Sequence, residues 1–109
     1  MFVRVARFEG ADPDTREERT ARLREAIEAV KSGNPPEEVP PEAAEVLRSS
    51  IHRVLALVDR EGVEANAVFC RTEEDLRRVD EVLNQMSPGE GDGHRTDLFH
   101  YEVLFEVEV

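Results

Sequence analysis

The run DLFHYEVLFEVEV, residues 97–109, alternates apolar and polar side chains almost without fault. This is the pattern of a β-strand with one buried face. Strands in small domains average five or six residues, so half of this strand has no partner within one chain. An uncovered apolar strand would aggregate, and a second copy of the chain is its natural cover. The sequence therefore predicts a homodimer that uses the C-terminal strand. Its apolar face carries Phe99, Tyr101, Val103, Phe105, Val107 and Val109.

The other elements follow from hydrophobic spacing and from turn residues. Leu23, Ile27 and Val30 recur at helical spacing, and Thr72 is suited to cap a second helix. The stretch from Gly89 to Gly93 is expected to be a flexible acidic loop. In chain order we predict a strand at 2–9, a helix at 15–31, a shorter helical segment from Pro40, strands at 51–58 and 63–71, a helix at 73–86 and the strand at 97–109.

This order predicts one α+β domain over residues 1–109, with the ferredoxin-like βαββαβ fold. Such a fold has an antiparallel four-stranded sheet with the helices on one face. The other face would carry Val3, Val5, Ala65, Ala67 and Phe69, which also need a cover. Two sheets packed face to face would supply it, so we expect the homodimer to form through the sheet faces and the C-terminal strand.

The composition excludes several classes of protein. A net charge of −11 argues against nucleic acid and anionic membranes as partners, because both are polyanions. The single cysteine, Cys70, rules out an internal disulfide and an iron–sulfur cluster. The start of the chain lacks the layout of a signal peptide, which predicts a cytoplasmic protein. Every basic residue except Lys31 is arginine, as in GC-rich bacterial coding sequences.

The chain resembles the antibiotic biosynthesis monooxygenase-like family of the dimeric α+β barrel superfamily. The resemblance covers nearly the whole chain: the first strand, the hairpin around residues 59–62, the passage from strand to helix at residues 69–76 and the closing strand. In the family, this passage is commonly an aromatic-tipped strand followed by Ser/Thr-Glu-Glu-Ala and an apolar residue. Here it is FCRTEEDL, with Asp75 in place of alanine.

The resemblance implies a pocket between the sheet and the helices. Some members oxidise polyketide quinone precursors there without a cofactor, and others degrade haem. The haem-degrading members have an Asn, a Trp and a haem-ligating His where this chain has Ala6, Cys70 and a helix at 73–86 without histidine. The quinone-forming oxygenases use Trp, Tyr and Asn, and this chain has no Trp and one Tyr. We therefore expect no cofactor, and the family's catalytic residues do not carry over.

Strand alternation groups Arg4, Asn66 and Cys70 on one face, which makes them pocket candidates. Arg4 is suited to bind an anionic or phenolate group, with Asn66 as a hydrogen-bond donor. The structural alternative is that Arg4 pairs with Glu64 and Asn66 is solvated. Cys70 is either a reactive thiol beside a helix N-terminus or, more commonly, a buried and inert side chain.

His100 and Tyr101 are the remaining pocket candidates, and as neighbours on a strand they point to opposite faces. His100 is suited to proton transfer, although pairing with Glu102 or an arginine would explain it equally. Tyr101 is expected to pack on the apolar face. His94, Asp97 and His100 match no metal-site spacing, so we expect no metal.

Two functions remain open. One is a cofactor-independent monooxygenase acting on a small aromatic or polyketide-like compound. The other is a non-catalytic dimeric module that binds a small apolar molecule or merely assembles. The second predicts a pocket filled by Phe2, Phe8, Leu76, Leu83 and Met86.

Overall fold

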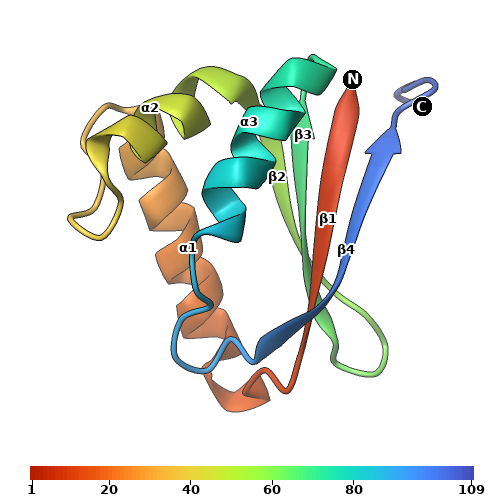
Figure 1. The fold of residues 1–109 in the computed structure, drawn as a ribbon. Coiled ribbons are helices and arrows are strands. Elements are labelled where there is room, and N and C mark those ends of the chain that lie inside the picture. Colours follow the sequence, from red (N-terminus) through yellow and green to blue (C-terminus); the bar gives the residue numbers. More distant parts are fainter.

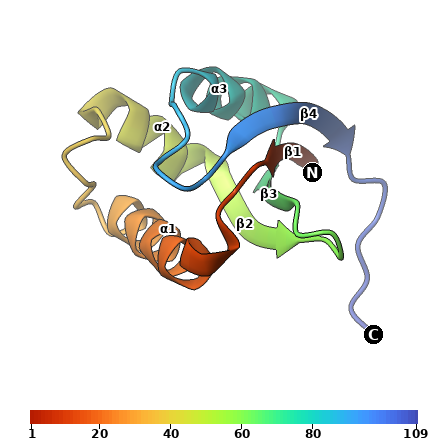
Figure 2. The same cartoon turned by 90° about the horizontal axis from the view of Figure 1, so that it is seen from below.

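The computed structural model describes residues 1–109 and confirms the ferredoxin-like α+β fold (Figure 1). Its four-stranded antiparallel sheet has the order β2-β3-β1-β4, and the helices cover one face of it (Figure 2). No helix combines the length and apolar character that crossing a bilayer requires. The elements are β1 (Phe2–Glu9), the short 3-10 helix η1 (Pro13–Thr15), α1 (Arg16–Lys31), α2 (Pro41–Ser50), β2 (Ile51–Val58), β3 (Glu64–Cys70), α3 (Glu73–Asn84) and β4 (His94–Glu102).

The helix α3 supplies most of the contact between the helices and the sheet. It begins where predicted, because the Thr72 hydroxyl accepts a hydrogen bond from the Asp75 backbone N–H at 3.1 Å. Leu76 and Val79 then lie one turn apart on its inner side and are buried. The hydrophobic core consists of Leu47, Val68, Cys70, Leu76 and Val79, so it lies between α2, α3 and β3.

The strand register decides which side chains face the helices. Glu64 contacts α1 through its carboxylate, so the even-numbered residues of β3 point toward the helices. Their partners on β1 include Arg4 opposite Val68 and Ala6 opposite Asn66. The predicted grouping of Arg4 with Asn66 and Cys70 on the helix side of the sheet is therefore correct.

The last strand differs from its prediction. The structure has β4 from His94 to Glu102, whereas the alternation predicted a strand from 97 to 109. The strand starts earlier because His94 pairs with Glu9, and a register shift beside Phe8 interrupts the alternation there. It ends at Glu102 because β1 begins at Phe2, and beyond this pair only the Val103 N–H finds a partner, the Met1 carbonyl.

The residues after β4 leave a large apolar surface uncovered. This C-terminal tail, residues 103–109, runs on the side of the sheet that carries no helix (Figure 2). Leu104 and Phe105 in it are 88% and 81% exposed. The sheet face itself also keeps Leu55, Leu57 and Phe99 exposed. Together these residues expose more apolar surface than scattered single side chains would, and no other part of the chain covers it.

Candidate functional site

A polar cluster joins β1, α3 and β4 on the helix side of the sheet. Its centre is Arg4, whose side chain is only 5% exposed. The Arg4 Nε donates to Asp80 Oδ1 at 2.7 Å, and its Nη2 donates to Asn84 Oδ1 at 2.9 Å. Asp80 and Asn84 lie one turn apart on α3, so both acceptors project toward β1 from the same side of the helix.

Each acceptor on α3 also contacts one side chain from β4. His100 Nε2 lies 3.0 Å from Asp80 Oδ1, and the Arg95 Nη1 donates to Asn84 Oδ1 at 2.6 Å. The other imidazole nitrogen, Nδ1 of His100, makes no hydrogen bond, and the His100 side chain is 43% exposed. The cluster therefore combines a carboxylate–imidazole pair with two guanidinium groups at a surface that solvent reaches.

The contacts of the Asp80 carboxyl determine the direction in which its pKa is shifted. Burial alone would raise the pKa of the Asp80 carboxyl, but the contacts with His100 and Arg4 outweigh burial and hold it below its ordinary value. Asp80 is consequently ionised at neutral pH. An ionised carboxylate beside one imidazole nitrogen helps to orient the ring, and Nδ1 is the nitrogen of His100 that has no partner in the chain.

The structure brings only two of the predicted pocket residues together. Arg4 and His100 meet through Asp80. Asn66 lies farther along the same face, opposite Ala6, and makes no side-chain hydrogen bond. Cys70 is fully buried in the core, and burial raises its pKa to about 11. The Cys70 thiol therefore stays protonated and enclosed at neutral pH, which supports the inert alternative.

Tyr101 lies on the opposite face of the sheet, as the alternation predicted. Its ring is stacked beside Phe99 at a centroid distance of 6.1 Å. Asp97 also points to this side, where it pairs with Arg7. Asp97 and His100 thus lie on different faces, and no group of three potential ligands is placed to hold a metal ion.

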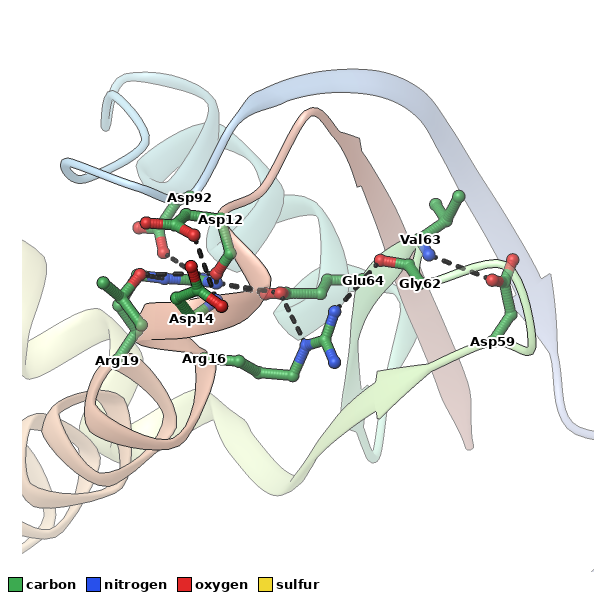
Figure 3. Close-up of polar contacts among 10 residues, drawn as sticks. Asp12, Asp14, Arg16, Arg19, Asp59, Gly62, Val63, Glu64 and Asp92 are labelled. Carbon is green, nitrogen blue, oxygen red and sulfur yellow. Dashed lines mark hydrogen bonds and ion pairs between the residues drawn. The ribbon is translucent and has the colours of Figure 1, made fainter.

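The expected ion pair between Arg4 and Glu64 is wrong. Glu64 instead accepts hydrogen bonds from Arg16 and Arg19, as Figure 3 shows. Arg19, buried in spite of its charge, also bonds the Asp92 carboxylate at 2.9 Å and the Asp12 carbonyl at 2.7 Å. Arg16 and Arg19 lie on the first turn of α1, within reach of β3, whereas Arg4 lies under α3.

This second cluster, which we call the Arg19 clamp, consists of Arg19, Glu64, Asp92 and Asp12. It fastens the start of α1 to β3 and to the glycine-rich segment before β4. The Asp12 N–H also donates to the Gly91 carbonyl at 2.8 Å. Gly93 approaches the chain so closely that a Cβ there would collide with the Glu9 carbonyl oxygen. These contacts tie the segment at 89–93 to the start of α1 and to the end of β1, and its flexibility stays a prediction.

The two most pronounced pockets do not coincide with the predicted pocket. One, of about 550 Å³, lies along α1 and is lined by Pro13, Arg16, Glu17, Thr20, Ala21 and Arg24. The other, of about 340 Å³, lies between the end of β1 and the turn that joins β2 and β3. Few hydrophobic residues line either pocket, whereas the cavities that bind aromatic ligands are lined mainly by hydrophobic and aromatic side chains.

A second surface that solvent reaches lies between α1 and β2. Leu23 follows Arg19 by one turn and so lies on the sheet-facing side of α1, yet it is exposed. Ala56 and Val58 pair with Asn66 and Glu64, so they face the helices, and both are also exposed. We call Leu23, Ala56, Val58 and Asn66 the α1–β2 surface. Its side chains are mainly apolar and have no partner in the chain.

Sequence reasoning missed Asp80, Asn84 and Arg95. Asp80 and Asn84 each follow an apolar residue of the inner stripe of α3, Val79 and Leu83, and this position beside the stripe was the available signal. Arg95 faces the helices only because of the register shift beside Phe8, which periodicity cannot reveal.

No family model matches the sequence, and no curated protein matches it. Among solved structures, the chain is similar to a mutant of MhuD crystallised with two manganese protoporphyrin IX groups bound per active site. The two chains align over 100% of their lengths with a TM-score of 0.60 and 13% sequence identity. At this identity the likeness concerns the fold alone. The chain therefore shares its ferredoxin-like fold with MhuD.

Proposed function

We propose that the protein is a cytoplasmic bacterial homodimer that acts as a cofactor-independent monooxygenase on a small aromatic or polyketide-like compound. The observation that carries this proposal is the Asp80–His100 pair, with the Nδ1 of His100 unbonded on a half-exposed ring. An oriented imidazole with a free lone pair is the usual general base in proteins. The overall negative charge of the chain further disfavours nucleic acid as a partner.

The proposed reaction begins when His100 Nδ1 removes a proton from an activated C–H or phenolic O–H of the substrate. The electron-rich anion that results reacts with O₂. For an anthrone, the CH₂ carbon becomes a carbonyl, one oxygen atom enters the product and the other leaves as water. The two hydrogens lost from carbon are thus the two of the water. Arg4 keeps Asp80 ionised and in place, so both are positioning residues.

A haem cofactor does not fit this chain. The helix on which the resemblance implies a haem-ligating histidine is α3, and it contains neither histidine nor cysteine. The neighbouring strand ends in Cys70, which is enclosed in the core. The proposed reaction therefore uses only the groups of the chain and molecular oxygen.

The test is oxygen consumption with dithranol, an anthrone, as the substrate. The wild-type protein is expected to accelerate conversion to the anthraquinone over the protein-free rate. The variant His100→Ala should lower kcat by about 100-fold, because a general base contributes at least that factor. His52→Ala is the matched control, since His52 is exposed on the far edge strand β2. Equal rates with and without the wild-type protein would rule out this activity on anthrones.

The exposed apolar sheet face and C-terminal tail support the proposed dimer, which would cover both. Burying a side chain such as Phe105 or Leu104 contributes about 1.5–3 kcal/mol. Packing two sheets face to face would also cover Leu55 and Phe99, as in aligned sheet sandwiches. In one chain Glu106 lies 3.9 Å from Arg53 on β2, so the tail and the edge strand carry opposite charges that a second copy can also pair.

A second candidate function is non-catalytic binding of a small apolar molecule. The observation that favours it is the α1–β2 surface, where Val58 is 49% exposed although it faces a helix. Two of the three nitrogens of the Arg4 guanidinium are also bonded to Asp80 and Asn84. The predicted filling of a pocket by Phe2, Leu76 and Leu83 agrees with their packing in or against the core, whereas Phe8 lies outside the core cluster and Met86 is exposed.

The binding alternative has its own test. Protein purified without denaturation is expected to carry a small adduct in its native mass spectrum. The variant Ala56→Trp should lose this adduct because the indole fills the α1–β2 surface. A Trp at Glu25, which is exposed on α1 and lines neither of the two pockets described above, serves as the control and should retain it. An adduct that survives Ala56→Trp would place the ligand elsewhere.

A further inference from the structure

One guanidinium group in the candidate site has no counter-charge. Most arginines in this acidic chain lie within 4.0 Å of a carboxylate. Arg60, Arg71 and Arg95 do not. Arg60 lies in an exposed turn, and Arg71 contacts His52. Arg95 alone among the three is held beside the Asp80–His100 pair.

Asn84 fixes the position of Arg95 without neutralising it. The amide oxygen of Asn84 accepts from Arg95 Nη1 at 2.6 Å and from Arg4 Nη2 at 2.9 Å. A neutral oxygen thus holds two cationic groups close together, and the only carboxylate bonded to either of them, Asp80, is taken by Arg4 and His100. The Nε and Nη2 of Arg95 make no hydrogen bond and are available to a ligand. An anion bound to the free nitrogens of Arg95 would gain charge-assisted hydrogen bonds and offset the repulsion between the two guanidinium groups.

The strand register places this free cation and the proposed base on the same side of β4. Arg95 pairs with Phe8 and His100 pairs with Arg4, so both point to the helix side of β4. Between them on the same side lies Leu98, which is apolar and partly buried. A flat ring over Leu98 would have a cationic group at one end and an imidazole at the other.

We infer that the ligand of this site is an aromatic compound with a carboxylate, and that Arg95 binds this carboxylate while His100 faces the reacting part of the ring. The inference rests on the proposed function for the role of His100. Arg95 acts here as a specificity-determining residue. The bond between its guanidinium and a carboxylate is bidentate in the favourable geometry, which an uncharged amide cannot reproduce.

The experiment compares two probes that differ only in charge, anthraquinone-2-carboxylate and anthraquinone-2-carboxamide. Binding of each to the full chain is measured by calorimetry at low ionic strength. The wild type is expected to bind the carboxylate about tenfold more tightly than the carboxamide. Arg95→Gln should abolish this preference. Arg60→Gln is the matched control, because it removes the same charge from an arginine that also lacks a carboxylate partner, and it should keep the preference.

Each possible result of this binding experiment either supports or overturns the inference about Arg95. Equal binding of the two probes to the wild type, absence of binding by either, or a preference that survives Arg95→Gln would overturn the inference. Failure of the proposed function is separable, because His100→Ala should lose turnover yet keep the carboxylate preference. A preference that depends on Arg95 in a protein without oxygenase activity would leave the anion site standing and remove the monooxygenase.

Discussion

Replacing Arg19 by methionine is expected to lower the free energy of unfolding by about 3 kcal/mol, the lower end of the cost of breaking a buried ion pair. For a domain of this size the midpoint of thermal unfolding should fall by roughly 12 °C. The Arg19 side chain is 8% exposed and that of Glu64 is 17% exposed. Without Arg19, the Glu64 carboxylate keeps only Arg16, and the Asp12 carbonyl loses a donor. The side chain of methionine fills the space but cannot donate a hydrogen bond.

The pH dependence of this loss of stability tests whether the ion pair between Arg19 and Glu64 causes it. The hydrogen bond from Arg19 holds the pKa of Glu64 below its ordinary value despite burial. A lowered carboxyl pKa stabilises the fold above the unfolded value of about 4.3, and this contribution is lost as the pH falls through the folded value. The difference between wild type and Arg19→Met should thus be constant from pH 6 to 8 and narrow only below roughly pH 4.

Urea unfolding at one fixed protein concentration measures both effects. Arg24→Met is the matched control, because Arg24 lies on the same helix and its side chain and that of its partner Glu28 are 81% and 65% exposed. It should change the free energy of unfolding by less than about 0.5 kcal/mol. A loss for Arg19→Met as small as that of the control would show that the clamp does not stabilise the fold. A large loss of the same size at pH 3 as at pH 7 would show that the stabilisation does not come from the ionised Glu64 carboxylate.

The fold could be predicted because its elements are encoded locally. Thr72 and the spacing of Leu76 and Val79 fix α3, and apolar runs separated by the turn at Asp59 fix the hairpin. The end of β4 could not be predicted in the same way. Alternation continues to Val109, but a strand lasts only as far as its partner, and β1 begins at Phe2.

The candidate site was predictable only in part. Alternation alone placed Arg4 on the helix side of the sheet, and it predicted that the side chains of His100 and Tyr101 point to opposite faces. The partner of both, Asp80, lies 76 residues from Arg4 in the chain, and no local pattern links them. Strand alternation made Glu64 the expected partner of Arg4, but two arginines of α1 bind its carboxylate instead. Long-range pairing of charges depends on how the helices pack, which periodicity does not determine.

The second large effect is expected from Phe99→Arg, which should convert the proposed dimer into a monomer. Phe99 lies opposite Val5 on the sheet face that carries no helix, stacked beside Tyr101. In one chain the new guanidinium would remain in water near Asp97, so the fold should tolerate it. In a two-fold symmetric dimer the same change occurs twice, and each copy would bury an unpaired charge. A buried, unpaired ion costs several kcal/mol, so the dissociation constant should rise by at least about 1,000-fold.

Native mass spectrometry measures this directly. The wild type should give about twice 12.4 kDa, and Phe99→Arg should give the single-chain mass. Circular dichroism checks that the variant still folds. Ala21→Arg is the control, since it adds the same charge on the exposed side of α1 and should leave the dimer intact. A wild-type monomer, or a Phe99→Arg dimer of unchanged affinity, would mean that the apolar sheet face is not the interface. The exposed tail at Leu104 and Phe105 would then need a different cover, because chains with such a surface associate in water.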